Sequence, residues 1–168
     1  ITTIAINAFD NAGKRDTING VVYSGNDTLN VSNYKFTNIG FLTFHLGNET
    51  YQTTEASVVY CDRTKIGAVV ISDSITFNDN TYPVTFIKGK AFYNCDNITS
   101  VTIPNTVVAI GRNGDTQGAS DNCNGLLFVT IGCNVISIGE NAFYNCTNLD
   151  SIVCLASVSP TLYRYAFK

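Results

Sequence analysis

The chain has 168 residues, of which 45% are hydrophobic and 14% charged, with a formal net charge of −3 and no cluster of lysine or arginine. This composition favours one folded, β-rich domain over a disordered chain, and the lack of a basic cluster excludes a nucleic-acid partner. No apolar run has the length that a membrane span needs, so we expect no membrane insertion in this segment. The chain begins at Ile1 and contains no methionine, which fits either a removed secretion signal or an excised segment.

Residues 1–85 predict a β-rich region of hairpins. Residues 4–12 echo a segment that recurs near the other end of the chain, which suggests a partial repeat. Alternating residues on both sides of Gly25-Asn26 predict a hairpin near residues 18–31. Residues 75–85 alternate around Asn-Asp-Asn, which predicts a second hairpin, and calcium binding by the oxygens of this turn is the weaker reading.

Residues 86–168 contain an internal repeat. Residues 91–98 read Ala-Phe-Tyr-Asn-Cys-Asp-Asn-Ile, and residues 142–149 read Ala-Phe-Tyr-Asn-Cys-Thr-Asn-Leu. A middle unit around Cys123 keeps the cysteine but has Ala-Ser where the others have Ala-Phe. Cys123 and Cys146 lie 23 residues apart, and the wider spacing from Cys95 fits the same period with an insertion in residues 112–120. A period in the low twenties is typical of leucine-rich repeats.

Each cysteine is followed by aliphatic residues with the spacing of a short strand. In the first copy Val101 and Ile103 alternate with Ser100 and Thr102, so one side of the strand is buried and the other faces solvent. A single strand of this kind cannot bury its apolar side alone, so we expect the copies to stack, with strands near Thr102, Thr130 and Val153.

The segment between one strand and the next predicts a compact, partly helical return. Gly111 and Gly139 lie where the chain turns into the next unit. We expect Phe92 and Phe143 to plug the inner side of their returns, while the middle unit lacks this plug at Ser120.

The full pattern, I-G-x-x-A-F-x-x-C-x-x-L-x-x-I-x-I-P, resembles the BspA-type leucine-rich repeat of bacterial and protist surface proteins. Residues 138–149 match it at every marked position, and the clear repeats cover residues 86–168. The resemblance implies a mainly β fold: a right-handed leucine-rich-repeat solenoid with short strands and short helical returns, preceded by a hairpin-rich N-terminal region in residues 1–85. The hairpin at 75–85 resembles the one that leads into the first repeat of such proteins.

The outward side of the strand ladder is the candidate ligand-binding surface. Its members are Ser100, Thr102, Phe128, Thr130, Ser151 and Val153. Phe128 and Val153 are apolar at positions predicted to face solvent, and such groups can anchor a partner. The alternative is that a neighbouring loop covers them, or that the in-and-out register is off by one residue.

The cysteines predict buried thiols in place of disulfides. Cys95, Cys123 and Cys146 share one repeat position and form a column in a solenoid, where parallel Cβ vectors give poor disulfide geometry. Cys154 occupies a strand position that is core in other copies, whereas Cys61 and Cys133 are the expected exceptions.

The sequence predicts no enzyme, cofactor or metal site. His45 is the single histidine, no cysteine lies in a catalytic motif, and no C-x-x-C pair is present. Five Asn-x-Ser/Thr sequons occur, at Asn26, Asn30, Asn48, Asn97 and Asn145. They are polar surface in a bacterial protein and acceptors for glycans in a eukaryotic secreted one.

Two functions remain open at this stage. The resemblance implies a secreted or cell-surface adhesion module, whose partner is an extracellular protein or glycan. The alternative is a structural segment of a longer surface protein or fibre, with no ligand of its own.

Overall fold

The computed structural model of the chain describes residues 3–5, 16–18, 21–23, 28–30, 35–47, 54–111, 118–120 and 122–168. Within these ranges the chain consists of strands and turns without a helix, and the strands gather in four sheets. Two of these sheets run along the repeats and form a solenoid.

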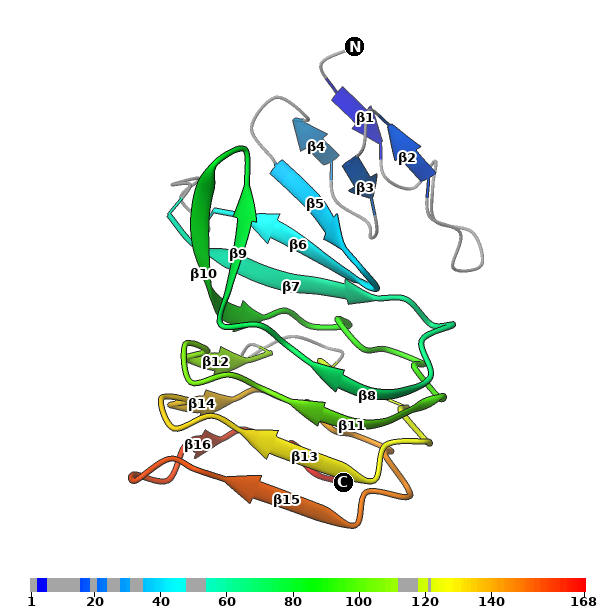
Figure 1. Cartoon of the computed structure of the whole chain (residues 1–168). Coiled ribbons are helices and arrows are strands. Elements are labelled where there is room, and N and C mark those ends of the chain that lie inside the picture. Colours follow the sequence, from blue (N-terminus) through cyan, green and yellow to red (C-terminus); the bar gives the residue numbers. More distant parts are fainter. Residues whose placement is uncertain are drawn as a thin grey trace.

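One sheet is a parallel ladder of four strands, which lie one below another in Figure 1. These strands are β8 (Gly67–Val70), β11 (Ile98–Thr102), β13 (Phe128–Ile131) and β15 (Ser151–Cys154). Val101 is level with Val129, and Val129 with Ile152, so equivalent repeat positions stack in register. The three strands predicted near Thr102, Thr130 and Val153 are therefore confirmed, and β8 adds a strand upstream of the recognised repeats.

A second sheet follows the same coils on another side of the solenoid (Figure 1). Its parallel strands are β7 (Ala56–Cys61), β10 (Asn80–Ile87), β12 (Ala109–Ile110), β14 (Ser137–Ile138) and β16 (Thr161–Leu162). The corner at residues 103–108 joins β11 to β12, and Pro104 lies just beyond the end of β11, where its missing N–H removes a ladder donor.

Antiparallel strands flank this second sheet. β5 (Lys35–Ile39) pairs with β6 (Leu42–Leu46), and β6 pairs with β7. β9 (Ser74–Phe77) forms a hairpin with β10, which confirms the hairpin predicted at 75–85. Its turn residues Asn78 and Asp79 have φ angles of 48° and 61°, the left-handed conformation that a type I′ turn requires.

The remaining strands correct one prediction. β2 (Asp16–Ile18) pairs with β3 (Val21–Tyr23), while β1 (Thr3–Ala5) pairs with β4 (Thr28–Asn30). The hairpin predicted around Gly25-Asn26 within residues 18–31 is therefore wrong. It would require β3 to pair with β4, whereas β3 pairs with the preceding strand, β2. Ile18 and Val21 are partners, and the residues between them, Asn-Gly, form the most favourable two-residue hairpin sequence. The partial repeat suggested at 4–12 falls almost entirely outside the described residues.

The core lies between the ladders and the returns. Val101, Val129 and Ile131 point inward from the first ladder, and Ile110 and Ile138 from the second; all are buried. Phe92 and Phe143 are buried at the inner side of their returns, as predicted, and Ser120 is buried at the equivalent position of the middle coil. Each coil thus closes its core against the coils on either side, as expected for a solenoid.

The returns are chains of turns, so the predicted helical returns are wrong. Within a return, Tyr93 N–H donates to the Lys90 carbonyl at 3.1 Å, but Asn94 then has a φ of 56°, which a right-handed helix cannot continue through. Other return amides bond to the next coil: Phe92 N–H donates to the Ala119 carbonyl at 2.7 Å. Backbone donors that a helix would use internally therefore hold neighbouring coils together.

Candidate functional site

The outward side chains of the first ladder form two rows across the strands. One row is Ala68, Ser100, Phe128 and Ser151. The other is Val70, Thr102, Thr130 and Val153. We call these eight side chains the outer face. Sequence reasoning found six of them and missed Ala68 and Val70, because β8 lies upstream of the recognised motif; the alternation in Gly-Ala-Val-Val was the available signal.

Exposure along these strands follows the predicted register. Phe128 and Val153 are each 50% exposed, and Val70 is 66% exposed, whereas Val101 and Val129 on the other side of the same sheet are buried. Phe128 lies between Ser100 and Ser151 in its row, so the ring is flanked by small hydroxyl side chains. Within the described residues no loop covers the Phe128 ring, contrary to the alternative in which a neighbouring loop buries it.

The outer face carries hydroxyl and apolar groups but no charge. The backbone groups of β11 and β13 are engaged in the ladder on both edges, whereas β8 and β15 each pair on one edge. The face is therefore a stiff platform with one prominent aromatic ring, and it has the composition of an interface core, where charged residues are depleted.

The cysteine column is buried and serves to join the coils. No disulfide joins any two of the six cysteines, all of which lie in described residues. The Cys123 thiol donates to the Phe92 carbonyl at 2.7 Å and the Cys146 thiol to the Ser120 carbonyl at 2.9 Å, while Cys95 approaches the Cys61 carbonyl at 3.7 Å. In each case the thiol reaches the return of the preceding coil. The burial predicted for Cys95, Cys123 and Cys146 is confirmed.

The surroundings of Cys123 disfavour the thiolate that nucleophilic catalysis needs. A hydrogen bond with Cys146, together with burial, raises the pKa of the Cys123 thiol far above its ordinary value, so the reactive thiolate is suppressed. Cys61 and Cys133 were expected to be exceptions to the burial of the thiols. Cys133 is exposed, but Cys61 is buried in β7. Cys154, predicted to be core, is exposed, because β15 is the last strand of its ladder and no described coil covers its inner side.

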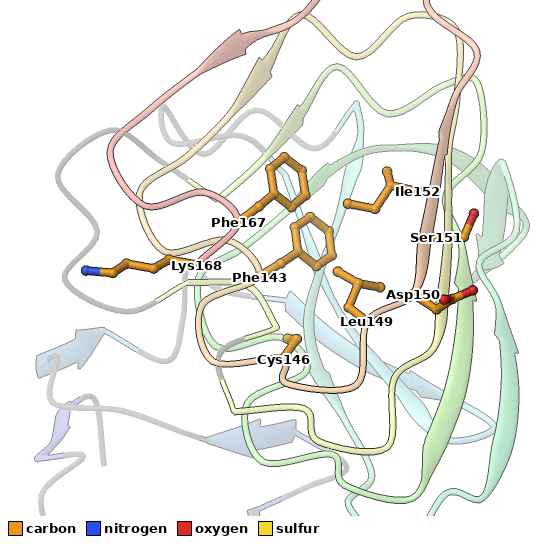
Figure 2. A pocket seen from close by; sticks show the side chains of 8 residues that line it. All are labelled: Phe143, Cys146, Leu149, Asp150, Ser151, Ile152, Phe167 and Lys168. Carbon is orange, nitrogen blue, oxygen red and sulfur yellow. The ribbon is translucent and has the colours of Figure 1, made fainter.

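A shallow hollow of about 320 Å³ opens where the two ladders end. Its lining residues are Phe143, Cys146, Leu149, Asp150, Ser151, Ile152, Phe167 and Lys168. Figure 2 shows the rings of Phe143 and Phe167 side by side, with their centroids 5.1 Å apart and their planes inclined by 5°. The sequence did not predict this hollow. Four of its lining residues, Phe143, Cys146, Leu149 and Ile152, occupy core positions of the last coil, whose equivalents are buried in the coils above.

His45 lies in β6 and is buried. Burial, and secondarily the positive charge of Lys88, lowers the pKa of His45 to about 4, so the ring is neutral at pH 7. The described part of the chain contains no group of three or more His, Cys, Asp or Glu side chains that could hold a metal ion. It also contains no helix that could cross a membrane.

Comparison with known proteins identifies the family. The BspA type leucine rich repeat region matches in six copies, over residues 1–114 and 30–168. Among solved structures, a leucine rich cell surface protein from Faecalibacterium prausnitzii is 30% identical with a TM-score of 0.56. The alignment covers 71% of this chain and 30% of the F. prausnitzii protein. A leucine-rich repeat protein from Bacteroides ovatus is 30% identical with a TM-score of 0.58. The alignment with it covers 68% of this chain and 28% of the B. ovatus protein.

The leucine rich repeat protein of T. pallidum is 26% identical with a TM-score of 0.56. The alignment covers 71% of this chain and 50% of the T. pallidum protein. The chain therefore spans half or less of the length of these three proteins. None of the curated proteins matches it. The family match extends over the whole chain and agrees with the stacked ladders of the structure, so the chain belongs to the BspA-type leucine-rich-repeat family.

Proposed function

We propose that the chain is a non-enzymatic binding module that presents its outer face to a protein or glycan outside the cell. One observation carries this proposal: Phe128, half exposed, stands among small uncharged side chains on a rigid parallel ladder. An exposed aromatic ring is an effective anchor for a partner, because it buries a large apolar area and loses little side-chain entropy.

The surroundings of Phe128 support the same role. Ser100, Thr130 and Ser151 are short, so a partner can reach the ring without moving other side chains, and their hydroxyl groups can form hydrogen bonds at its rim. Val153 lies on the neighbouring strand and adds apolar area. Because the ladder strands are already paired, binding would order little of the backbone, which favours affinity.

A secreted or cell-surface location forms part of this proposal. The F. prausnitzii relative is described as a cell surface protein. Adhesion is the activity that a wide and rigid repeat surface serves best. Catalysis is not proposed, because the Cys123 thiol is held protonated and His45 is neutral and buried inside a sheet.

The test is a biosensor screen of the chain against extracellular-matrix proteins and glycans, repeated with Phe128→Glu and Val153→Glu. Both substitutions should abolish binding with little loss of stability, because the side chains are half exposed. Tyr144→Glu is the matched control: it introduces the same charge at an exposed ring on the return side and should bind normally.

Melting curves on each variant separate loss of binding from loss of folding. Normal binding by both outer-face variants would show that this surface is not the site. If no protein or glycan binds the parent chain, the structural alternative, a segment of a longer surface protein without a ligand, becomes the better interpretation.

A further inference from the structure

Two cations and a tyrosine gather on the return at residues 164–168. The Arg164 guanidinium carbon lies 4.6 Å from the centroid of the Tyr165 ring, and the Lys168 ammonium nitrogen lies 4.4 Å from it. Tyr165 is 42% exposed, so the group is open to solvent. Figure 2 shows the Lys168 side chain pointing away from the hollow, on the side opposite to Asp150. We call Arg164, Tyr165 and Lys168 the cationic cluster.

The two cations of the cluster lack a carboxylate partner. Within the described part of the chain neither Arg164 nor Lys168 forms an ion pair, although Glu140 holds the position of Arg164 in the preceding coil. Arg164 instead donates from Nη2 to the Tyr165 hydroxyl oxygen at 2.9 Å. Two like charges beside one ring repel each other, and the ring compensates for this only in part. An anion bound between them would remove the repulsion.

The backbone conformation of Tyr165 is unfavourable for its side chain. Its φ of 57° is left-handed, and a bulky residue pays a free-energy cost in this region. Asn141 precedes Ala-Phe in the same way, with a φ of 53°, and asparagine tolerates the left-handed region better. Asparagine would therefore serve the fold better than tyrosine at position 165. A strained and exposed aromatic residue points to a role other than folding.

The cluster offers several strong donors to an anion. The Tyr165 oxygen accepts a hydrogen bond from Arg164, so its own proton stays free to be donated. Arg164, through this bond and its charge, and then Lys168 lower the pKa of the Tyr165 hydroxyl, which makes it a stronger donor. The other guanidinium N–H groups and the ammonium group of Lys168 form charge-assisted bonds. This set of donors suits one carboxylate or sulfate group.

The preceding return adds groups that suit a sugar. Asn145 N–H donates to the Lys168 carbonyl at 2.6 Å, so the two returns lie side by side. Tyr144 and Lys168 each follow directly after one of the two stacked phenylalanines, so they hold equivalent positions. Tyr144 is 37% exposed, and its ring can cover the apolar face of a sugar. The acid group of a peptide would use the cations but leave this ring without a matching surface.

We propose that the cationic cluster, together with Tyr144, binds an acidic glycan through one of its carboxylate or sulfate groups. The site lies on the returns and is distinct from the outer face, so it is a second binding surface and does not depend on the function proposed above. Nucleic acid is a less suitable anion, because two cations are too few to neutralise a run of phosphates.

Biosensor titration of the purified chain against two glycans tests the proposal. Heparin carries sulfates as well as carboxylates, whereas hyaluronan carries carboxylates alone, so a preference between them identifies the acid group. We expect binding to at least one of them at about 50 mM salt, and weaker binding at about 500 mM because salt screens the cations. Arg164→Gln and Lys168→Gln should each raise the dissociation constant about tenfold or more, since each removes a charge-assisted bond.

Lys90→Gln is the matched control. Lys90 is exposed and precedes Ala-Phe in an earlier coil, as Tyr165 does in the last one. Its replacement changes the net charge of the chain by the same amount as the cluster substitutions but leaves the cluster intact. The dissociation constant should therefore stay unchanged.

Tyr165→Asn separates binding from folding. This variant should weaken glycan binding about tenfold, while its melting temperature stays the same or rises because asparagine relieves the backbone strain. Tyr144→Glu should also weaken binding, since it places a negative charge beside the acid group. Phe128→Glu changes only the outer face and should have no effect on this ligand, so failure of one proposal is distinguishable from failure of the other.

Four outcomes would overturn the proposal: neither glycan binds the parent chain, binding survives both cation substitutions in the cluster, the Lys90→Gln control weakens binding to the same extent, or polyglutamate binds as tightly as the glycans. The third outcome would indicate attraction by charge alone, and the fourth would indicate an acidic peptide as the ligand.

Discussion

Truncation of the two aromatic plugs, Phe92→Ala and Phe143→Ala, tests the packing of the repeat. Both rings are buried, and deletion of a buried phenylalanine side chain costs about 3–5 kcal/mol of unfolding free energy. The structure predicts that the two substitutions lower the free energy of unfolding by different amounts within that range. Phe92 has a coil on each side, so its removal leaves a closed cavity and the loss should lie near the upper end.

Phe143 lines the open hollow at the end of the ladders, so water can enter the space that its ring leaves. The lost contacts include the stacked ring of Phe167, and an aromatic pair contributes about 0.5–1.5 kcal/mol. We therefore expect about 3 kcal/mol for Phe143→Ala and about 4–5 kcal/mol for Phe92→Ala.

Urea unfolding followed by circular dichroism and by tyrosine fluorescence measures both values. The two probes must agree and the m-value must stay constant, because repeat proteins can unfold in parts. A loss below about 1 kcal/mol for Phe143→Ala would mean that the ring is not part of the core. Equal losses, or the reverse order, would contradict the packing difference between a closed coil and an open one.

Three more outcomes follow from the same structure. Thiol titration should find Cys95, Cys123 and Cys146 unreactive in the native chain and reactive in urea, and mass spectrometry should detect no disulfide among them. Gly125→Ala should cost about 1–3 kcal/mol in urea unfolding, since a Cβ there would collide with the Asp96 carbonyl oxygen, and a neutral result would contradict this close approach. His45 has a pKa lowered to about 4 from 6.5, so the unfolded state binds more protons between these values and stability falls as pH drops through this window. The loss from pH 7 to pH 5 is at most about 2 kcal/mol, and His45→Gln should flatten the slope of the urea midpoint against pH.

The sequence predicted the stacked part of the fold because repetition displays the core directly. Positions such as Val101, Val129 and Ile152 recur at a fixed distance after a cysteine, and only stacking in register buries them together. The same register predicted the exposure of Phe128 and Val153, because a strand alternates its side chains.

The upstream coil was not recognised because it lacks the motif. β8 joins the first ladder through backbone pairing with β11, which requires an alternating strand but no Ala-Phe or cysteine. Cys61 was misjudged for the same reason: it occupies the return position that Phe92 holds in the next coil, as its N–H bond to the Ala91 carbonyl shows. A short upstream unit without the signature residues is missed when the chain is compared only with its own downstream motif, although the family model extends over it.

The returns were misjudged because local propensity competes with the neighbouring coil. Asn94, Asn141 and Asn145 adopt left-handed φ angles of 53–56°, a conformation that asparagine tolerates better than most residues. The amides of Asn141 and Asn145 themselves bond to the adjacent coil: Asn141 N–H donates to the Arg164 carbonyl at 3.2 Å and Asn145 N–H to the Lys168 carbonyl at 2.6 Å. The bonds between coils exist only after stacking, so a single unit read alone favours a helical turn.

The solenoid also explains why the outer face is a suitable place for function. A core residue such as Val129 contacts the coils on both sides, so changing it disturbs three coils at once. An outward residue contacts only its lateral neighbours, and a substitution there alters the surface with little effect on folding. Stacking therefore places no demand for a large ring in the row of Ala68, Ser100, Phe128 and Ser151. Folding does not require Phe128, and water disfavours an exposed ring, so its presence supports the proposal that a partner contacts the outer face.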